Sequence, residues 1–339
     1  MTSLPAPRFD HLVAMTDARG TFEHAEFSEP RPEHGYCTDD MARVLVVATR
    51  EPRPVPAVRR LAEISLRFLS DAQDMDGNYR NRRNQNGRWD DRPTLDDCWG
   101  RSIWGLGTAA SHSNVDWVRQ AATSQFERAA GQRSIWPRAM AFAALGAAEL
   151  LAVKPDHRGA RHLLEDAANG MAALTDAAAW PWPEARLTYA NAVLPEAMIA
   201  AGDVLDRPTL LQDGLRLLSW LLDHEMADGR LSVTPAGGAG PGDIRPAFDQ
   251  QPIEVAALAD ACARAAAVDD NPRWADGITA AVAWFLGDND AQLVMWDPDT
   301  GGGFDGLLVD VVNLNQGAES TLALLSPLQH GRYLTPVPA

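Results

Sequence analysis

The stretch His34-Gly-Tyr-Cys-Thr-Asp-Asp-Met-Ala-Arg43 leads directly into the apolar run Val44-Leu-Val-Val-Ala48. Its threonine is of a type that caps helix N-termini, which would place Asp39 and Asp40 in the first turn, where the helix dipole favours negative charge. Arg43 follows Asp40 by three residues and falls on nearly the same face. The stretch therefore predicts a buried helix that begins with a polar cassette, although a capped helix with a merely structural Asp–Arg pair has the same pattern.

Segments of this kind recur along the chain and alternate with a second kind of helix. The first kind is apolar on nearly every side and rich in alanine, and a helix that is apolar all round must be buried. Its members are residues 39–50, 96–110, 137–153, 191–205, 252–268 and 316–325. The second kind carries one apolar stripe and a polar face. Its members are residues 8–17, 58–72, 116–130, 158–174, 210–226 and 274–285.

The alternation of the two kinds predicts the fold. Buried and amphipathic segments form pairs with a repeat of about 50–60 residues, which is typical of a helical array. A ring of six buried helices surrounded by six outer ones is an (α/α)6 toroid, so we predict an all-α protein in which residues 1–339 form one domain. The alternatives are an open α-solenoid or two helical bundles. An open solenoid needs polar terminal caps, and the last buried segment is apolar.

Loop lengths predict which face of the toroid is functional. Connections from a buried segment to the next amphipathic one are short, whereas most connections in the other direction are long and polar. Long loops in a compact domain are usually functional. Three of them contain similar turns, at residues 76–79, 228–231 and 303–307, which predict short β-hairpins. All these loops should lie on the face where the buried helices begin.

Composition argues against several classes of function. The formal net charge of −16 disfavours nucleic acid and anionic membranes as partners. No apolar run reaches membrane-spanning length, and residues 1–9 lack the apolar core of a signal peptide. The three cysteines are odd in number and show no metal-type spacing. We therefore expect a soluble, cytoplasmic protein.

We also expect neither a cofactor nor a metal. The chain contains no glycine-rich phosphate loop and no HExxH zinc pattern. Residues Asp297-Pro-Asp-Thr-Gly301 are similar to the start of a calcium loop, but Leu308 stands where a bidentate glutamate is needed.

Polar cassettes stand where the loops enter the buried helices, so they should converge on one pit. Paired carboxyl groups can act as acid and base, carboxamides and acids bind hydroxyls, and aromatic rings stack on the C–H faces of sugars. The candidate catalytic residues are Glu254, Asp40, Asp97 and Glu319. The candidate substrate-binding residues are His34, Tyr36, Arg43, Trp99, Arg101, Trp182, Tyr189, Asn191, Gln251, Asn315 and Gln316. Together they predict a sugar or oligosaccharide as the ligand.

Each candidate also has a structural explanation. Asp97 could simply compensate a helix dipole, and Trp99 fits wall packing as well as a sugar platform. Glu254 and Glu319 lie in helices that otherwise exclude charge, where a buried acid is costly unless it is paired or used. Cys37 flanks acids, but no histidine or asparagine is arranged to activate a thiol, so we interpret it as structural.

Four motifs together resemble the six-hairpin glycosidase-like superfamily. They are His34-Gly-Tyr-Cys-Thr-Asp-Asp40, Asp97-Cys-Trp-Gly-Arg101, Leu187-Thr-Tyr-Ala-Asn191 and Asn315-Gln-Gly-Ala-Glu-Ser320. More closely, the chain is similar to a bacterial carbohydrate-active (α/α)6 domain that often accompanies family-4 glycosyltransferases, and here we expect the toroid to stand alone. The resemblance implies a sugar substrate, and relatives include hydrolases, phosphorylases, lyases and epimerases. Ala190 stands where relatives carry an aspartate, which removes one acid.

These observations favour a glycoside hydrolase of the inverting kind that acts on a small oligosaccharide. Glu254 would be the general acid, because its apolar helix should raise its pKa. Asp40 or Asp97 would be the base, kept ionised by a helix N-terminus and by Arg43 or Arg101. On this hypothesis Glu254→Gln should cut turnover by roughly 10²–10⁴-fold. The four candidate acids should line one pit within roughly 15 Å of one another, since packed helix axes lie about 8–10 Å apart.

Two other classes of function remain open. A sugar epimerase or phosphorylase could have the same fold; an epimerase usually employs histidines, and in this sequence His34 and His24 are the ones suitably placed. A non-catalytic glycan-binding or scaffolding domain would bind sugar without turnover, and its binding would survive the loss of any single acid.

Overall fold

The computed structural model of the chain describes residues 4–171 and 180–334. Every second helix of this part belongs to an inner set. The inner helices are α2 (Thr38–Arg50), α4 (Asp97–His112), α6 (Pro137–Val153), α8 (Val193–Val204), α10 (Pro252–Ala266) and α12 (Ala318–Gly331). The outer helices are α1 (Asp10–Ala14), α3 (Pro56–Ala72), α5 (Asp116–Ala129), α7 (Arg158–Met171), α9 (Pro208–His224) and α11 (Arg273–Phe285).

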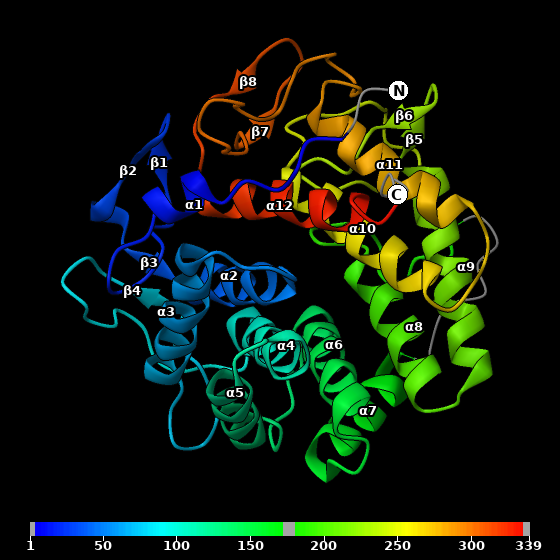
Figure 1. Ribbon diagram of the computed structural model, residues 1–339. Helices are drawn as coiled ribbons and strands as arrows, with labels where there is room; N and C mark the ends of the chain where they lie inside the picture. Colours follow the sequence, from blue (N-terminus) through cyan, green and yellow to red (C-terminus); the bar gives the residue numbers. More distant parts are fainter. Residues whose placement is uncertain (1–3, 172–179, 335–339) are drawn as a thin grey trace, which may run out of the picture.

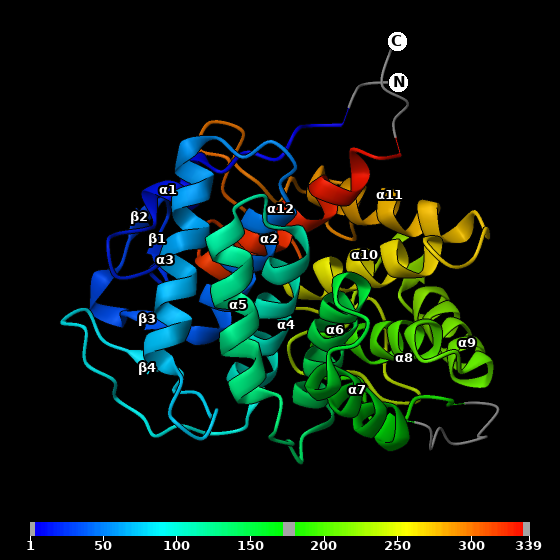
Figure 2. The same ribbon diagram turned by 60° about the horizontal axis from the view of Figure 1, so that its bottom comes forward.

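The inner helices form a closed ring. Each one packs against the next, from α2 and α4 round to α12, and α12 packs against α2 again. The outer helices α3, α5, α7, α9 and α11 lie on the perimeter, each against the inner helix that precedes it in the chain (Figure 1). The second view shows α3 and α5 covering the ring from outside (Figure 2). The predicted all-α toroid of six helical hairpins is confirmed, and the open solenoid is excluded.

Close approach of the helices explains the small residues of the inner ring. A Cβ added to Gly107 of α4 would lie 2.0 Å from the carbonyl oxygen of Gly146 in α6. A Cβ on Gly146 would in turn lie 2.2 Å from the carbonyl oxygen of Ile103. No side chain fits at such distances, so these two backbones touch only because both positions are glycine. No helix of the described chain is long and apolar enough to cross a membrane.

Helix boundaries agree with the predicted segments to within three residues, except at the end of α12. The first outer helix is only five residues long. Helix α8 begins at Val193 because Ala190, just before it, adopts a left-handed φ of 44°. Helix α12 continues to Gly331, past Pro327. Residues 172–174 of the predicted segment 158–174 lie outside the described residues.

The long loops lead from the outer helices to the starts of the inner ones and carry small β-ladders, as predicted. The strand pairs are β1 (Ala25–Glu26) with β2 (Glu29–Pro30), β3 (Tyr36–Cys37) with β4 (Arg82–Arg83), β5 (Met226–Ala227) with β6 (Arg230–Leu231), and β7 (Gly306–Leu307) with β8 (Val312–Asn313). Asp228 and Gly229 form the β5–β6 turn with φ angles of 51° and 81°, the left-handed pair that tight hairpins need. The predicted turn at residues 303–307 is instead the entry to β7.

Candidate functional site

A polar cavity of about 420 Å³ opens where the inner helices begin. We call it the N-end cavity. Six of the predicted site residues line it: Asp40, Arg43, Arg101, Tyr189, Gln251 and Glu319. Residues that the sequence analysis did not place in the site also line it, and they are Glu23, His24, Cys37, Asp39, Arg82, Asp305, Asn313, Gly317 and Ser320.

The first turn of α2 is held in place by the loop that follows α3. Pairing of β3 with β4 brings Asn81 beside the helix start. The Asn81 Oδ1 accepts hydrogen bonds from the backbone N–H of Thr38 (3.1 Å) and of Asp39 (3.4 Å), so Asn81 caps the helix from outside. Thr38, the cap expected from the sequence, instead donates its hydroxyl to the carbonyl oxygen of Arg80.

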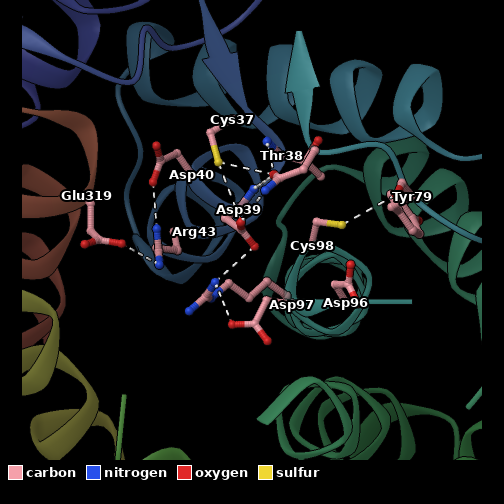
Figure 3. A network of polar contacts seen from close by, with 12 residues as sticks. Cys37, Thr38, Asp39, Asp40, Arg43, Tyr79, Asp96, Asp97, Cys98 and Glu319 are labelled. Carbon is pink, nitrogen blue, oxygen red and sulfur yellow. Dashed lines mark hydrogen bonds and ion pairs between the residues drawn. The ribbon is translucent and has the colours of Figure 1, made fainter. Parts of the chain in front are cut away.

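Arg43 connects two carboxylates across the cavity wall. Its Nη1 lies 2.6 Å from Oδ1 of Asp40 and its Nη2 lies 2.7 Å from Oε2 of Glu319. Figure 3 shows this guanidinium between the two acids, which come from α2 and α12. Asp40 is buried, whereas the side chain of Glu319 is 43% exposed. The arrangement fixes Asp40 while leaving Glu319 accessible from the cavity.

Asp40 is the carboxyl group whose environment disfavours charge. Burial raises its pKa to about 7, against the opposing effect of Arg43 and with further contributions from Glu319 and Glu23. At neutral pH a large fraction of Asp40 is therefore protonated and able to donate a proton.

Asp39, the adjacent residue, has the opposite behaviour. Burial disfavours its charge, but the guanidinium groups of Arg101 and Arg43 outweigh that cost, so its pKa is lowered. Nη1 of Arg101 lies 3.0 Å from Oδ1 of Asp39 and 3.2 Å from Oδ2 of Asp97. Two neighbouring acids whose environments push their pKa values apart are the pattern of an acid/base pair.

Tyr189 supplies an aromatic face to the same cavity. Its ring stacks on the guanidinium of Arg138, whose carbon lies 4.9 Å from the ring centroid, and the residue remains 44% exposed. Burial and Asp97 raise the pKa of Tyr189 to about 12, so the hydroxyl stays neutral and can donate a hydrogen bond. The neutral hydroxyl of Tyr189 can bond a sugar hydroxyl, and its partly exposed ring can stack on the C–H face of the sugar.

The expected placement of Glu254 in the pit is wrong. Its carboxylate accepts hydrogen bonds from the backbone N–H groups of Ala190 and Asn191 and from the Asn191 amide, and it does not line the N-end cavity. Burial and Glu225 raise its pKa to about 8, while these donors lower it. Glu254 therefore accepts hydrogen bonds from the free N–H groups just before α8. These backbone groups are the partners that its buried carboxyl group requires.

The structure also corrects the predicted aromatic platforms. Tyr36, Trp99 and Trp182 are fully buried, and none of them lines the N-end cavity. The Tyr36 hydroxyl donates to Asp17 at 2.8 Å, and Trp182 stacks on Trp220. These rings fill the packing between helices and loops, which is the other common use of large aromatic side chains.

The remaining predicted residues lie outside the cavity lining. The buried side chain of Gln316 is bonded to Thr300 and Asp297, and Asn315 accepts the N–H of Phe27. Asn191 is buried against Glu254 and Arg138. His34 packs edge-on against His24, with ring centroids 5.0 Å apart, and Asp97 is tied to Arg101. Of the four candidate acids, Asp40 and Glu319 line the N-end cavity.

Most of the residues that the sequence analysis missed come from one kind of segment. Glu23, Arg82, Asp305 and Asn313 belong to the long loops and their short strands. No helical periodicity marks such residues. The signal that was available is the loop length itself, since these are the loops predicted to build the functional face.

One group of ligand atoms in the described chain has spacing that suits a metal. Atoms of Glu23, Cys37 and Asp40 lie within 4.8 Å of one another. Burial, Asp39 and Asp40 hold the pKa of the Cys37 thiol well above its usual range, and Arg82 is paired with Glu23. The thiol would therefore have to lose its proton, and Glu23 its ion pair with Arg82, before these residues could hold a metal ion.

The ring axis continues below the N-end cavity. An apolar waist of about 40 Å³ lies next, and Arg43 lines both it and the N-end cavity. Since one water occupies about 30 Å³, the waist has no room for a sugar. Beyond it, a second cavity of about 280 Å³ opens where the inner helices end, and we call it the C-end cavity.

The fold is that of known sugar-converting enzymes. A cellobiose 2-epimerase from Bacillus thermoamylovorans superposes with a TM-score of 0.72 at 12% identity, covering 95% of both chains. A D-mannose isomerase gives 0.69 at 9% identity, covering 96% of this chain and 94% of the other. An inactive α-1,6-mannanase variant from Salegentibacter in complex with α-1,6-mannotetrose gives 0.62 at 12%, covering 96% of both.

No protein-family model matches the chain, and no curated protein matches it in sequence. The similar structures include epimerases, an isomerase and glycoside-cleaving enzymes. At these identities the similarity establishes the six-hairpin (α/α)6 fold, and one fold can carry many activities.

Proposed function

We propose that this protein is a glycoside hydrolase that acts on a small oligosaccharide in the N-end cavity, with Asp40 as general acid and Asp39 as its ionised partner. The observation that carries the proposal is the placement of two adjacent acids on the wall of one polar cavity, with a pKa of about 7 for Asp40 because of burial and a pKa below its usual value for Asp39 because of its arginines. Both residues face a polar cavity large enough for a small ligand.

The proposed chemistry follows from the contacts. Oδ1 of Asp40 accepts a hydrogen bond from Arg43, so its proton would reside on Oδ2 and pass to the oxygen of the leaving sugar. Asp39, held by Arg101 and Asn81, would take a proton from the attacking water. The two carboxyl groups are held by different arginines, and on the inverting course that we propose a water molecule would lie between them.

One property of a structural neighbour supports this assignment. The Salegentibacter mannanase is inactive when two consecutive aspartates are replaced. In this chain the consecutive pair Asp39–Asp40 starts α2 and lines the N-end cavity.

Other features of the proposal concern ligand and context. Neutral groups of the cavity wall, from Tyr189, Gln251, Asn313 and Ser320, would bind sugar hydroxyls. We retain the expectation of a cytoplasmic protein that binds no nucleic acid. Membership of the group that accompanies family-4 glycosyltransferases likewise stays a prediction.

A screen of aryl glycosides and short oligosaccharides tests the proposal. ¹H NMR of the first product would show net addition of water and an inverted anomer. Asp40→Asn should abolish turnover of unactivated substrates and retain part of the activity on glycosides with good leaving groups, which need no protonation. Equal loss on both substrate types would remove Asp40 from the acid role. Sugar binding without any turnover would favour the glycan-binding alternative, and products carrying phosphate would indicate a phosphorylase.

A sugar epimerase is the second candidate, because His24 lines the N-end cavity with His34 packed against it. Proton abstraction at a ring carbon needs a base of this type. The two activities separate in one experiment in D₂O. An epimerase exchanges a carbon-bound hydrogen of a free reducing sugar for deuterium, whereas a hydrolase leaves carbon-bound hydrogens unlabelled. Loss of that exchange in His24→Asn with hydrolysis absent from the wild type would replace our proposal by this one.

A further inference from the structure

The C-end cavity is a second built site that the proposed hydrolysis does not use. Helices α2, α4, α10 and α12 end around it, and its mouth is open at the half-exposed His112 side chain. The apolar waist separates it from the N-end cavity. A ligand bound here therefore cannot be part of a sugar held at Asp40.

Arginines in this cavity are matched with acids. Arg50 pairs with Asp260 at 2.8 Å, Arg264 pairs with Glu149, and Arg332 pairs with Glu51 at 2.9 Å. His330 also bonds Asp260, at 2.6 Å, and His112 bonds Glu149 at 2.9 Å. Each of these cations thus makes its shortest contact with an acid other than Glu196.

Glu196 is the acid left over. It lies in the first turn of α8, is 3% exposed, and lines both the waist and the C-end cavity. Its nearest cation in the described chain is Arg264, with Nε 3.9 Å from Oε1, and its carboxyl group makes no hydrogen bond there. Burial and Asp260 raise its pKa to about 8. A buried carboxyl group that faces a cavity without a partner is costly and is completed by a ligand.

Acceptor atoms remain open in the wall of this cavity. Asp260 receives all its hydrogen bonds, from Arg50, Ser326 and His330, on Oδ1, which leaves Oδ2 open. The Oε1 of Gln329, which lines the same cavity, is buried without a donor. One donor of the wall, the Nε of Arg264, is likewise buried without a hydrogen-bond acceptor. The C-termini of the surrounding helices add partial negative charge.

From the carboxyl group of Glu196, which makes no hydrogen bond, and the open Oδ2 of Asp260 we infer that the C-end cavity binds a small organic cation, a primary ammonium group that donates to Glu196 and Asp260. A compact metal ion would need three or more ligand atoms close together, and among the described residues the group with that spacing lies elsewhere, at Glu23, Cys37 and Asp40. A volume of about 280 Å³ instead suits an ammonium group with a short carbon chain.

Calorimetry and thermal unfolding with three probes of equal size test the inference: propylammonium, 1-propanol and propionate. The wild type should bind propylammonium and be stabilised by it, and should respond to neither of the others. Because Glu196 is largely protonated below its pKa of about 8, binding at neutral pH should release a proton, which calorimetry detects in buffers of different ionisation enthalpy. The groups facing Glu196 that also set this linkage are Asp260, Glu149, Arg264 and Arg50.

Glu196→Gln keeps the size of the side chain and removes the charge, and it should weaken propylammonium binding by at least about tenfold, or 1.4 kcal/mol. Asp270→Asn, an exposed acid just after α10, is the matched control and should bind normally. Equal binding in both variants, or equal stabilisation by propanol, would overturn the inference. If Glu196→Gln fails to fold, the wild type is titrated with propylammonium while the ¹³C NMR signal of the Glu196 carboxyl group is followed. A signal that does not move would also overturn the inference.

Discussion

The N-end and C-end cavities of the ring contain similar charged pairs but differ in what surrounds them. At the N-end, Asp39 and Asp40 have a lowered and a raised pKa, set by arginines and by burial. At the C-end, Asp260 and Glu196 show the same division, since Arg50 and His330 lower the pKa of Asp260 despite burial, while burial raises that of Glu196. Opposite shifts in a neighbouring pair therefore do not by themselves identify a catalytic site.

Loops make the difference between the two ends. The N-end cavity has a wall of long loops, which add neutral hydrogen-bonding groups and the exposed ring of Tyr189 to the charged pairs. At the C-end the connections between helices are short, so the wall of the C-end cavity consists mainly of the helices themselves. The predictions below test whether the chemistry belongs to the first end alone.

The largest expected effect is that of Asp40→Asn. This change removes the proton donor while keeping the shape, and it should lower kcat/KM for an unactivated glycoside by roughly 10²–10⁴-fold. Thermal unfolding should show a folded protein, because the amide still accepts from Arg43. The matched control is Glu29→Gln, an exposed acid of β2, which should retain wild-type activity. An active Asp40→Asn enzyme would end the distinction between the two cavities.

A pH profile gives the next effect. The general acid must be protonated, so log kcat/KM should fall by about one unit per pH unit above the pKa of Asp40, about 7. Glu319 raises the pKa of Asp40, so Glu319→Gln should lower that pKa and move the alkaline limb to lower pH. A limb that stays in place in this variant would show that another group controls it.

The ring could be predicted from the sequence because burial on all sides leaves a pattern that needs no partner to interpret. Helix α6 is rich in alanine and buried on nearly every side, and only an inner position accepts such a helix. Long and short connections then predicted the face on which the N-end cavity opens. Both inferences depend on local composition, which the chain displays directly.

The side chains of the site were harder to predict because rotation about a helix axis decides which of two neighbours faces the pit. Asp39 and Asp40 both line it, whereas Trp99 and Tyr36 turn into the packing. Glu254 shows the limit most clearly. A buried acid must be paired or used, and its partner proved to be the backbone before α8, more than sixty residues earlier in the chain. Such a contact leaves no mark on the sequence around Glu254.

Glu254→Gln therefore separates structure from chemistry. The amide keeps one acceptor but directs its NH₂ group at backbone N–H donors, so the free energy of unfolding should fall by about 1–3 kcal/mol. Activity should stay within about tenfold of the wild type, with the loss in KM, because Tyr189 stands next to the anchored residue Ala190. Denaturant unfolding and steady-state kinetics measure the two quantities. A kcat loss as large as that of Asp40→Asn, without loss of stability, would return Glu254 to the acid role.

The smallest effect concerns stability at the C-end. A glutamate whose folded pKa is about 8, against 4.5 when unfolded, loses stabilising free energy as the pH rises through that interval, because the unfolded chain ionises first. The lowered pKa of Asp260 places its own contribution below pH 4, outside the interval. Glu254 titrates in the same interval in both proteins, so its contribution cancels in the difference.

Replacement of Glu196 by glutamine removes that penalty. Compared with the wild type, Glu196→Gln should have a Tm raised by roughly 1–2 °C at about pH 8, the shift that about 1 kcal/mol produces in a chain of this length, and little or no gain at about pH 5. Asp270→Asn provides the comparison for a general loss of negative charge and should show no such pH dependence. If the Tm gain is the same at both pH values, burial does not keep Glu196 neutral in the folded protein. The proposed difference between the acids of the two cavities would then fail.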